Sequence, residues 1–289
     1  MPELPEVEVL VRHLRPLLLG KTIRAVQIRR ERVIRPTSVA KLKRALVGAK
    51  FGELTRRGKF LLFQLRHPHR KDPFTLVGHL GMTGRMFVLR PGEALPKHAA
   101  VVLELGSRRF VYEDQRYFGR LTLDDSSVAR MGPEPLSQDF TPEKFAEALA
   151  GSSRAIKVRL LDQDLVAGVG NIYASEALFR ARIAPQLAAG KLNPTQVRAL
   201  WRTIREVLTQ AIRFGSTIPL NHGEKSASSD GLFYYGRAEG TPDYYEERLR
   251  VYDRAGQPCI RCKTAIRRIV QAARSTYFCP KCQGKISAR

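Results

Sequence analysis

The chain has 289 residues, enough to bury a substantial core, and its length suggests two domains with a small appendage. Its 50 Lys and Arg residues against 27 Asp and Glu give a net charge of +23, which favours nucleic acid as partner, with an anionic membrane surface second. No apolar run is long enough for a transmembrane helix, and Glu3, Glu6 and Glu8 stand where a secretory signal needs positive charge, so neither a membrane-spanning nor a secreted protein is expected.

The N-terminal half changes from a helical to a β pattern. Val7, Leu10, Val11 and Leu14 recur at helical spacing, and we expect Pro16 to end that helix. Short β-like runs follow between turns rich in Gly, Pro and charged residues, at 23–34, 60–65, 100–105 and 109–112. Strands of this length and spacing predict a β-sandwich or barrel.

The second half is predicted to be mainly helical. Residues 131–136 are typical of a linker, because two prolines and a glycine interrupt the pattern. Helices are expected over 142–149 and 153–161, from Asn171, and after the capping pair Asn193-Pro194. The last of these has one apolar face, which we interpret as helix core. Residues 221–243 are rich in Gly and Ser, which is typical of a mobile loop.

Four cysteines near the C-terminus predict a zinc site. Their order is Cys259-x2-Cys262, sixteen residues, then Cys279-x2-Cys282, which fits tetrahedral coordination by four thiolates in a reducing compartment. Because no thiolate is replaced, no open coordination position remains, so the ion is expected to be structural. Strands at 266–270 and 275–278 would form a hairpin that holds basic side chains against a phosphate backbone: Arg261, Lys263, Arg267, Arg268 and Arg274.

Two further segments have both a functional and a structural interpretation. Residues 160–173 predict a helix, a tight turn at Gly168 and Gly170, and a new helix with Asn171 as N-cap. The exposed N–H groups there could bind a phosphate, or the segment could be an ordinary helical hairpin. At the chain start, removal of Met1 would leave Pro2 as a secondary amine, and a terminal α-amino group has a pKa of about 8.

Such an amine can attack a sugar carbon and form a Schiff base, with Glu3 as the acid–base group. The alternative is that these residues only mark the start of a helix, since Pro and Glu are both favoured in the first turn.

Taken together, these motifs resemble the bacterial formamidopyrimidine-DNA glycosylases, which share a fold with endonuclease VIII. The resemblance covers nearly the whole chain. The sequence around Leu4 is similar to that of the branch of the family that acts on purine lesions. It is carried by residues 2–7, 57–59, 79–84, 132–136 and 160–173, and by the four cysteines with Arg274 before the third.

The resemblance implies an α+β fold. An N-terminal β-sandwich with flanking helices would carry the catalytic chain end, followed by a helix-two-turn-helix domain and a zinc-finger hairpin. The implied boundaries are 1–131 for the catalytic domain, 132–140 for a linker, 141–220 for the helical domain, 221–245 for a variant lesion-capping loop, and 246–289 for the zinc hairpin.

The resemblance also implies roles for individual residues. Pro2 would attack C1′ of the damaged nucleotide, Glu3 would open the sugar and assist elimination, and Lys59 would contact a nearby phosphate. Lys157, Asn171, Arg274 and His79 match DNA-binding positions. Met82, Arg116 and Phe118 match the side chains that fill the gap left by the flipped nucleotide, with Arg116 reading the opposite cytosine.

Without the resemblance, Met82 and Phe118 would be interpreted as core, and Lys59 and Lys157 as a solvated face. The chain also departs from the family pattern, with Tyr117 in place of a phosphate-contacting arginine and Lys263 in place of a glycine. A third departure, in 217–245, bears on lesion preference.

We therefore expect a bifunctional DNA glycosylase and abasic-site lyase that removes 8-oxoguanine and formamidopyrimidines, with β,δ-elimination. It would hold one structural Zn²⁺, need no redox or nucleotide cofactor, and act on double-stranded DNA as a monomer in the bacterial cytoplasm. The alternatives are a related enzyme that prefers oxidised pyrimidines and a damaged-DNA-binding protein without catalysis.

Overall fold

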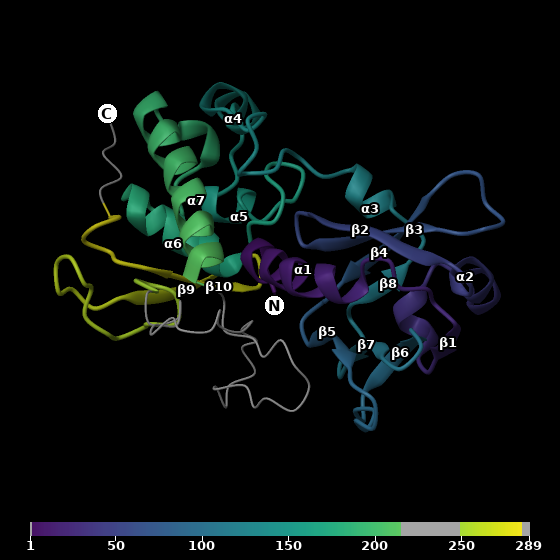
Figure 1. Cartoon of the computed structure of the whole chain (residues 1–289). Helices are drawn as coiled ribbons and strands as arrows, with labels where there is room; N and C mark the ends of the chain where they lie inside the picture. Colours follow the sequence, from purple (N-terminus) through teal and green to yellow (C-terminus); the bar gives the residue numbers. More distant parts are fainter. Residues whose placement is uncertain (1, 215–248, 285–289) are drawn as a thin grey trace. The chain divides into compact units, whose positions relative to one another are not determined.

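A computed structural model describes residues 2–214 and 249–284 of the chain, which divide into two compact units (Figure 1). The described part of the first unit is 2–130, and that of the second is 131–214 with 249–284. The predicted loop 221–243, the variant stretch 217–245 and the end of the predicted helical domain lie wholly or mostly outside the described residues. None of the described helices is long and apolar enough to cross a membrane.

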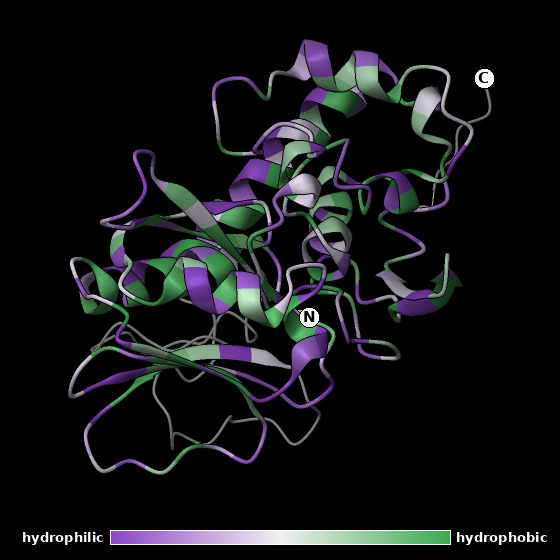
Figure 2. Cartoon of the chain, turned by 90° about the vertical axis from the view of Figure 1, so that its right-hand side faces the viewer, coloured by the Kyte–Doolittle hydropathy of each residue, from purple (hydrophilic) through white to green (hydrophobic). Residues whose placement is uncertain are grey.

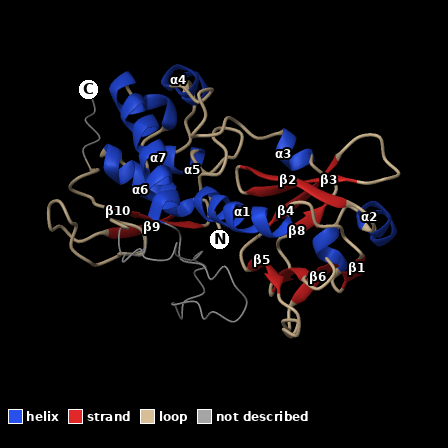
Figure 3. Cartoon of the chain, viewed as in Figure 1, coloured by secondary structure: helices blue, strands red, loops and turns tan. Residues whose placement is uncertain are grey.

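The first unit is built on two antiparallel sheets, as predicted (Figure 3). One sheet has the order β1-β6-β7-β5, from β1 (Ala25–Ile28), β6 (Ala99–Glu104), β7 (Arg109–Asp114) and β5 (Gly84–Leu89). The other has the order β2-β3-β4-β8, from β2 (Lys50–Arg57), β3 (Phe60–Arg66), β4 (Phe74–His79) and β8 (Arg120–Thr122). The sheets share one core, in which Phe63 and Phe110 meet edge to face with ring centroids 5.6 Å apart.

Helix α1 (Leu4–Leu18) belongs to the same core. Its buried stripe includes Leu10 and Leu14, and Figure 2 shows hydrophobic and hydrophilic residues alternating along it. The expectation that Pro16 ends the helix is wrong. Pro16 lies in the last turn, where its missing N–H removes one hydrogen bond, and burial of Leu18 keeps the chain helical for two more residues.

The strand expected over 23–34 is also interrupted. Only β1 is extended, and a 3-10 turn, η1 (Glu31–Ile34), follows it. Val33 and Ile34 are consecutive and both fully buried, which a strand with alternating faces does not allow. The short helices α2 (Val39–Leu46) and α3 (Ser126–Ala129) complete this unit.

The second unit combines helices with a two-stranded hairpin. Its elements are α4 (Pro142–Leu149), α5 (Ile156–Arg159), α6 (Asn171–Ala181), η2 (Ala189–Lys191), α7 (Pro194–Phe214), β9 (Arg267–Gln271) and β10 (Arg274–Phe278). The predicted bounds of α4 and the predicted start of α7 are confirmed. At that start, Asn193 Oδ1 accepts from Gln196 N at 2.9 Å and Gln196 Oε1 accepts from Asn193 N at 3.0 Å.

Two expectations for this unit need correction. The helix expected over 153–161 is reduced to the single turn α5, because Ala155 is paired with Ala188 and Ile156 N donates to Leu187 O. Within the α7 stripe, Trp201 is only partly buried, and its indole N–H donates to Phe140 O at 2.7 Å. The segment 131–136 is hydrogen-bonded to this unit, since Gly132 N donates to Gln163 O at 2.9 Å.

Candidate active site, phosphate-binding residues and metal centre

The start of α1 fixes the predicted nucleophile and its acid–base partner. Pro2 is buried, and Glu3, the N-cap, is only 2% exposed. Glu3 N donates to Glu6 Oε2 at 2.8 Å, and the Glu3 carboxylate caps the backbone of Glu6 in return. This capping box holds the backbone of the first turn in one conformation, directly after Pro2.

Two arginines attach α1 to strand β2. Arg15 donates to Leu54 O at 2.9 Å, and Arg56 Nε donates to Glu8 Oε2 at 3.0 Å while its Nη1 donates to Gly58 O. Burial raises the pKa of Glu8, but its hydrogen bonds to Arg12 and Arg56 outweigh burial and lower the pKa overall. The chain end is therefore tied to the turn that follows Arg56.

That turn carries Lys59, which lies between β2 and β3 after the left-handed Gly58. Lys59 is only 7% exposed, so the interpretation as a solvated surface lysine is wrong. The register of the sheet pairs the next residue, Phe60, with His79 of β4, and their rings lie 4.7 Å apart.

His79 is held in its neutral form. Burial, then the positive charges of Lys59 and Arg120, lower its pKa to about 4, against a smaller opposing effect of Asp114. Its Nδ1 accepts from Gly81 N at 3.1 Å, which leaves the proton on Nε2. Near pH 7, His79 can therefore donate one neutral hydrogen bond from Nε2.

A buried carboxylate joins the two loops that carry the predicted gap-filling side chains. Asp114, at the end of β7, is 0% exposed and accepts hydrogen bonds from several groups. Thr83 Oγ1 donates to it at 2.6 Å, Gly119 N at 2.8 Å, and Tyr112 Oη and Arg116 N each at 3.2 Å. Thr83 belongs to the loop of Met82, and Arg116 and Gly119 to the loop of Phe118, so one side chain organises both loops.

Glycines let these loops approach each other. Gly81 has a φ of +62°, and a Cβ there would lie 2.5 Å from Gly119 N. A Cβ on Gly119 would lie 2.0 Å from the Tyr112 hydroxyl. Neither position can accept a side chain without moving backbone.

The side chains at the loop tips differ in exposure. Phe118 is 44% exposed with Arg116 stacked on it, the guanidinium carbon lying 4.7 Å from the ring centroid. The interpretation of Phe118 as core is therefore wrong. Met82 is half-buried.

In the second unit, three predicted DNA-binding positions lie together. Lys157 of α5 is completely buried and its Nζ donates to Asn171 Oδ1 at 2.5 Å, which rules out a solvated face. Asn171 Nδ2 donates to Ser275 O of β10 at 2.8 Å, next to the exposed Arg274. Asn171 thus connects α5 to the hairpin.

This role replaces the expected cap. The N-cap of α6 is Gly170, and Asn171 is its first helical residue, with its side chain turned to Lys157 and Ser275. Gly168 has the expected positive φ of +83°, but Gly170 is extended. The turn is held by Gln163, which accepts from Gly168 N at 2.9 Å and donates to Val169 O at 3.0 Å.

A second buried carboxylate joins the hairpin segment to α6. Glu176 is completely buried and accepts from the backbone N–H groups of Arg250, Val251 and Tyr252 at about 3 Å. Burial raises its pKa, and these backbone hydrogen bonds oppose that effect. Glu176 therefore anchors the backbone of residues 250–252 to α6.

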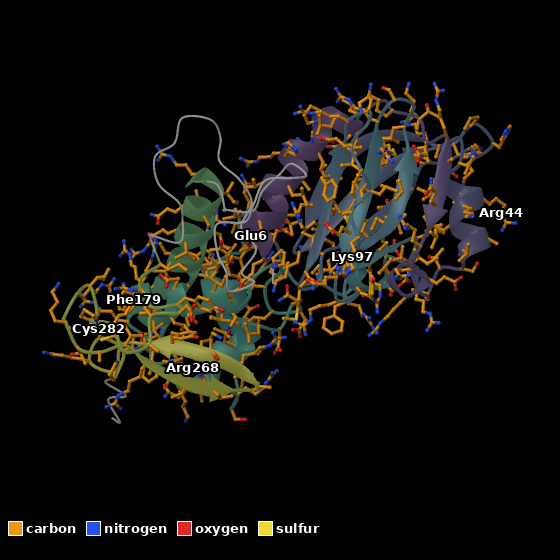
Figure 4. The ribbon with its side chains drawn as sticks, turned by 90° about the horizontal axis from the view of Figure 1, so that it is seen from below. Glu6, Arg44, Lys97, Phe179, Arg268 and Cys282 are labelled. Carbon is orange, nitrogen blue, oxygen red and sulfur yellow. The ribbon has the colours of Figure 1, made fainter. Side chains whose placement is uncertain are left out.

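The four cysteines fit a zinc ion. Their Sγ atoms all lie within 4.8 Å of one another, with Cys259–Cys282 at 3.9 Å and Cys262–Cys279 at 3.4 Å. Tetrahedral Zn–S bonds of about 2.3 Å require sulfur–sulfur separations near 3.8 Å. Backbone N–H groups of Arg261 and Cys282 point to Sγ atoms of Cys259 and Cys279, as in thiolate sites. Figure 4 places Cys282 beside the hairpin strands.

Two basic residues of this region have structural roles. Lys263, at the position where the family has glycine, adopts a left-handed φ of +64°, and its N–H donates to Cys259 O at 2.9 Å. Arg261 Nη1 donates to Phe179 O at 3.0 Å at the end of α6 and stacks on that ring. Arg261 therefore has a structural role at the end of α6, and its expected contact with the phosphate backbone stays a prediction.

Sequence reasoning missed several residues that hold these sites. The spacing of Glu3 and Glu6 matches a capping box and could have revealed Glu6. Asp114, Arg56 and Glu176 were missed because each also bonds to a residue far away in the chain, Thr83, Glu8 and Tyr252, at separations of 31 to 76 residues.

The comparisons with known proteins agree with this geometry. Models of the formamidopyrimidine-DNA glycosylase N-terminal domain, its H2TH domain and a zinc finger found in FPG and IleRS match residues 1–121, 131–221 and 256–284. The formamidopyrimidine-DNA glycosylase of Symbiobacterium thermophilum is 45% identical, covering 98% of this chain and 89% of the relative. That of Thermus thermophilus is 43% identical over 99% of both chains.

Solved structures extend the likeness to the fold. The Thermus thermophilus MutM (FPG) crystal structure has a TM-score of 0.81 at 41% identity, covering 98% of this chain and 99% of that one. A Lactococcus lactis FPG variant in complex with Fapy-dG-containing DNA has a TM-score of 0.84 at 33% identity, covering 98% and 100%. The chain therefore belongs to the formamidopyrimidine-DNA glycosylase family, whose members are DNA glycosylases of base-excision repair with a C-terminal zinc finger.

Proposed function

We propose that this protein removes oxidised purines from double-stranded DNA and then cleaves the strand, with Pro2 as nucleophile. The observation that carries this proposal is the buried Pro2-Glu3 pair at the capped start of α1, tied through Arg56 to the turn of Lys59. Related structures are described as complexes with Fapy-dG DNA, carbocyclic 8-oxo-G DNA and abasic-site DNA, which supports the same substrates here.

The chemistry requires a free secondary amine at Pro2, so Met1 has to be removed. The Pro2 nitrogen attacks C1′, the bond from C1′ to the damaged base breaks, and Glu3 supplies the proton that opens the sugar at O4′. The resulting Schiff base makes the C2′ proton acidic, so loss of that proton expels the 3′ phosphate, and a second elimination expels the 5′ phosphate. Hydrolysis then frees Pro2.

The remaining site residues would place the DNA for this reaction. Lys157, Asn171 and Arg274 would bind phosphates next to the lesion, and His79 would donate Nε2–H to another as a neutral group. Met82, Arg116 and Phe118 would enter the gap left by the flipped nucleotide. The exposure of Phe118 and the rigid base provided by Asp114 support that role.

Preference for oxidised pyrimidines is a second candidate. A related Lactococcus lactis complex is described with an oxidised pyrimidine in its DNA, at 33% identity. Comparing rates on 8-oxoguanine, formamidopyrimidine and oxidised-pyrimidine duplexes separates the two. A binding protein without catalysis is the third candidate, and nicking of abasic DNA excludes it.

The organisation of the chain supports further parts of the proposal. We infer a catalytic domain over 1–131, a linker over 132–140, a helical domain over 141–220, a lesion-capping loop over 221–245 and a zinc hairpin over 246–289. We also infer that the enzyme acts as a monomer in the bacterial cytoplasm.

The decisive experiment is borohydride trapping on an 8-oxoguanine·cytosine duplex, with mass mapping of the cross-linked peptide. An adduct on an N-terminal Pro2 is expected, and the Glu3→Gln variant should bind the duplex but form the adduct much more slowly. An adduct only on an abasic duplex would keep the lyase chemistry and reject the purine preference. No adduct on either duplex would reject the nucleophile.

A further inference from the structure

Three exposed arginines surround the aromatic tip of loop 114–119. Arg30 Nε donates to the Tyr117 hydroxyl at 3.0 Å, and its guanidinium carbon lies 5.5 Å from the centroid of that ring. Arg32 and Arg116 lie 5.8 and 4.7 Å from the centroid of Phe118. We call these five residues the arginine–aromatic cluster.

The positive charge of this cluster is not neutralised by its surroundings. Among the described residues, Arg30, Arg32 and Arg116 form no ion pair with a carboxylate, although Glu31 lies between two of them in sequence. Aromatic rings and a phenol hold the guanidinium groups without cancelling their charge. Like charges held together repel, and an anionic ligand relieves that repulsion.

Arg30 is the best oriented of the three. Besides the bond from Nε to Tyr117, its Nη1 donates to Arg29 O at 3.1 Å, and its backbone N–H bonds to Ala100 O at 3.2 Å. The backbone of Arg30 is thus bonded to β6, and its guanidinium group is bonded to Tyr117 and to the carbonyl of Arg29. No described residue accepts a hydrogen bond from Nη2, so this amino group can bind an oxygen from solvent or ligand.

Tyr117 provides the support for Arg30. Its φ of +54° is left-handed, which is rare for a residue with a side chain and is found where surrounding contacts enforce it. The partly buried ring packs against the core of the first unit, while the hydroxyl points to Arg30. A phenol orients the guanidinium as a carboxylate would, but leaves its full charge for a ligand.

We propose that Arg30, oriented by Tyr117, binds a backbone phosphodiester of the duplex into which loop 114–119 inserts. The inference rests on the proposed function, because insertion of Phe118 is what would bring a DNA backbone beside the cluster. A guanidinium whose Nε and Nη1 are already bonded, and whose Nη2 has no acceptor among the described residues, suits a phosphate oxygen. Phosphate contacts of this kind position the protein without reading sequence. Arg30 is then a DNA-binding residue that acts from the turn between β1 and η1 and not from the inserted loop.

The test compares Arg30→Ala with Arg44→Ala, each as the full zinc-loaded protein. Arg44 is an exposed arginine on α2 with no aromatic or ion-pair contact among the described residues, so its replacement removes the same charge elsewhere on the same unit (Figure 4). Dissociation constants for a duplex with a stable abasic-site analogue are measured between about 50 and 200 mM salt. Loss of one phosphate contact should reduce the slope of log K against log salt by about 0.9.

We expect Arg30→Ala to weaken binding about tenfold at the low-salt end with that smaller slope, and Arg44→Ala to change neither by more than about twofold. Tyr117→Phe keeps the charge but loses the hydroxyl, so binding should weaken several-fold with an unchanged slope. That effect should disappear when Arg30 is already alanine. Equal slopes for the two arginine variants would overturn the proposal, as would a Tyr117→Phe effect that persists without Arg30.

A separate readout distinguishes this failure from failure of the proposed function. Borohydride trapping of the wild type and of Arg44→Ala on abasic DNA at saturating protein tests the chemistry of the proposed function without altering Arg30 or Tyr117. A wild type that forms no adduct would reject the proposed chemistry, while the salt slopes would still decide on Arg30.

Discussion

The protonation of His79 provides a quantitative test of the geometry around Lys59. Burial together with Lys59 and Arg120 lowers the pKa of His79 to about 4, whereas in the unfolded chain it titrates near its ordinary value of about 6.5. Between these two pH values the unfolded chain binds a proton that the folded protein excludes. The free energy of unfolding therefore decreases as the pH falls from about 6.5 towards 4.

The size of the effect follows from the two pKa values. At pH 5 the unfolded imidazole is almost fully protonated and the folded one mostly neutral, which costs the folded state about 2 kcal/mol relative to neutral pH. His79→Gln removes the titration and keeps a neutral N–H donor in place of Nε2. We therefore expect the variant to lose about 2 kcal/mol less than the wild type between pH 7 and pH 5.

Two measurements check this expectation. Carbon–proton NMR of the six histidine rings gives the pKa of His79 directly, with its signal identified by its loss in His79→Gln. Urea unfolding followed by far-ultraviolet circular dichroism gives the pH dependence of stability. Tryptophan fluorescence is unsuitable, because the single tryptophan, Trp201, lies in the second unit and would report on that unit, whereas His79 lies in the first. A His79 midpoint above pH 6 would refute the proposed surroundings of the ring.

Three other variants test the supporting structure. Asp114→Asn should loosen the two gap-filling loops, because Asp114 accepts hydrogen bonds from both. We expect this variant to slow excision of 8-oxoguanine at least tenfold and to change borohydride trapping on abasic DNA much less. Equal losses in both assays would contradict this expectation. Chelation of zinc, or Cys279→Ser, should unfold the β9–β10 region and lower DNA affinity, and an unchanged affinity in verified metal-free protein would argue against that role. The combined change Ala272→Asn and Ala273→Gly should raise the melting temperature of the second unit, which Trp201 fluorescence measures. Both turn residues have a left-handed φ, which costs an alanine about 1 kcal/mol and which Asn and Gly adopt more easily. An unchanged or lower melting temperature would refute this prediction.

Elements governed by neighbours in sequence were predicted well. The bounds of α4, the capped start of α7 and the two hairpin strands follow from short-range patterns of apolar, capping and turn residues. The cysteine spacing predicted a four-thiolate cluster, which the structure confirms. In these segments the interactions that decide the conformation lie within a few residues of one another.

Expectations failed where distant partners decide the outcome. Pairing of Ala155 with Ala188 shortens α5, and core burial extends α1 beyond Pro16. Lys157 has the sequence context of a surface residue, yet it is completely buried against Asn171. None of these outcomes is encoded in local periodicity, because each depends on a contact across the unit.

The sequence by itself determined the fold class, the family, the zinc ligands and the candidate nucleophile, since these depend on residue types at fixed spacings. Only the tertiary structure decided that Asp114 joins two loops, that His79 is neutral and that Arg30 is oriented by Tyr117. The physical reason is that burial, charge proximity and hydrogen-bond geometry arise between residues tens of positions apart, which are brought together only when the sheets and helices pack.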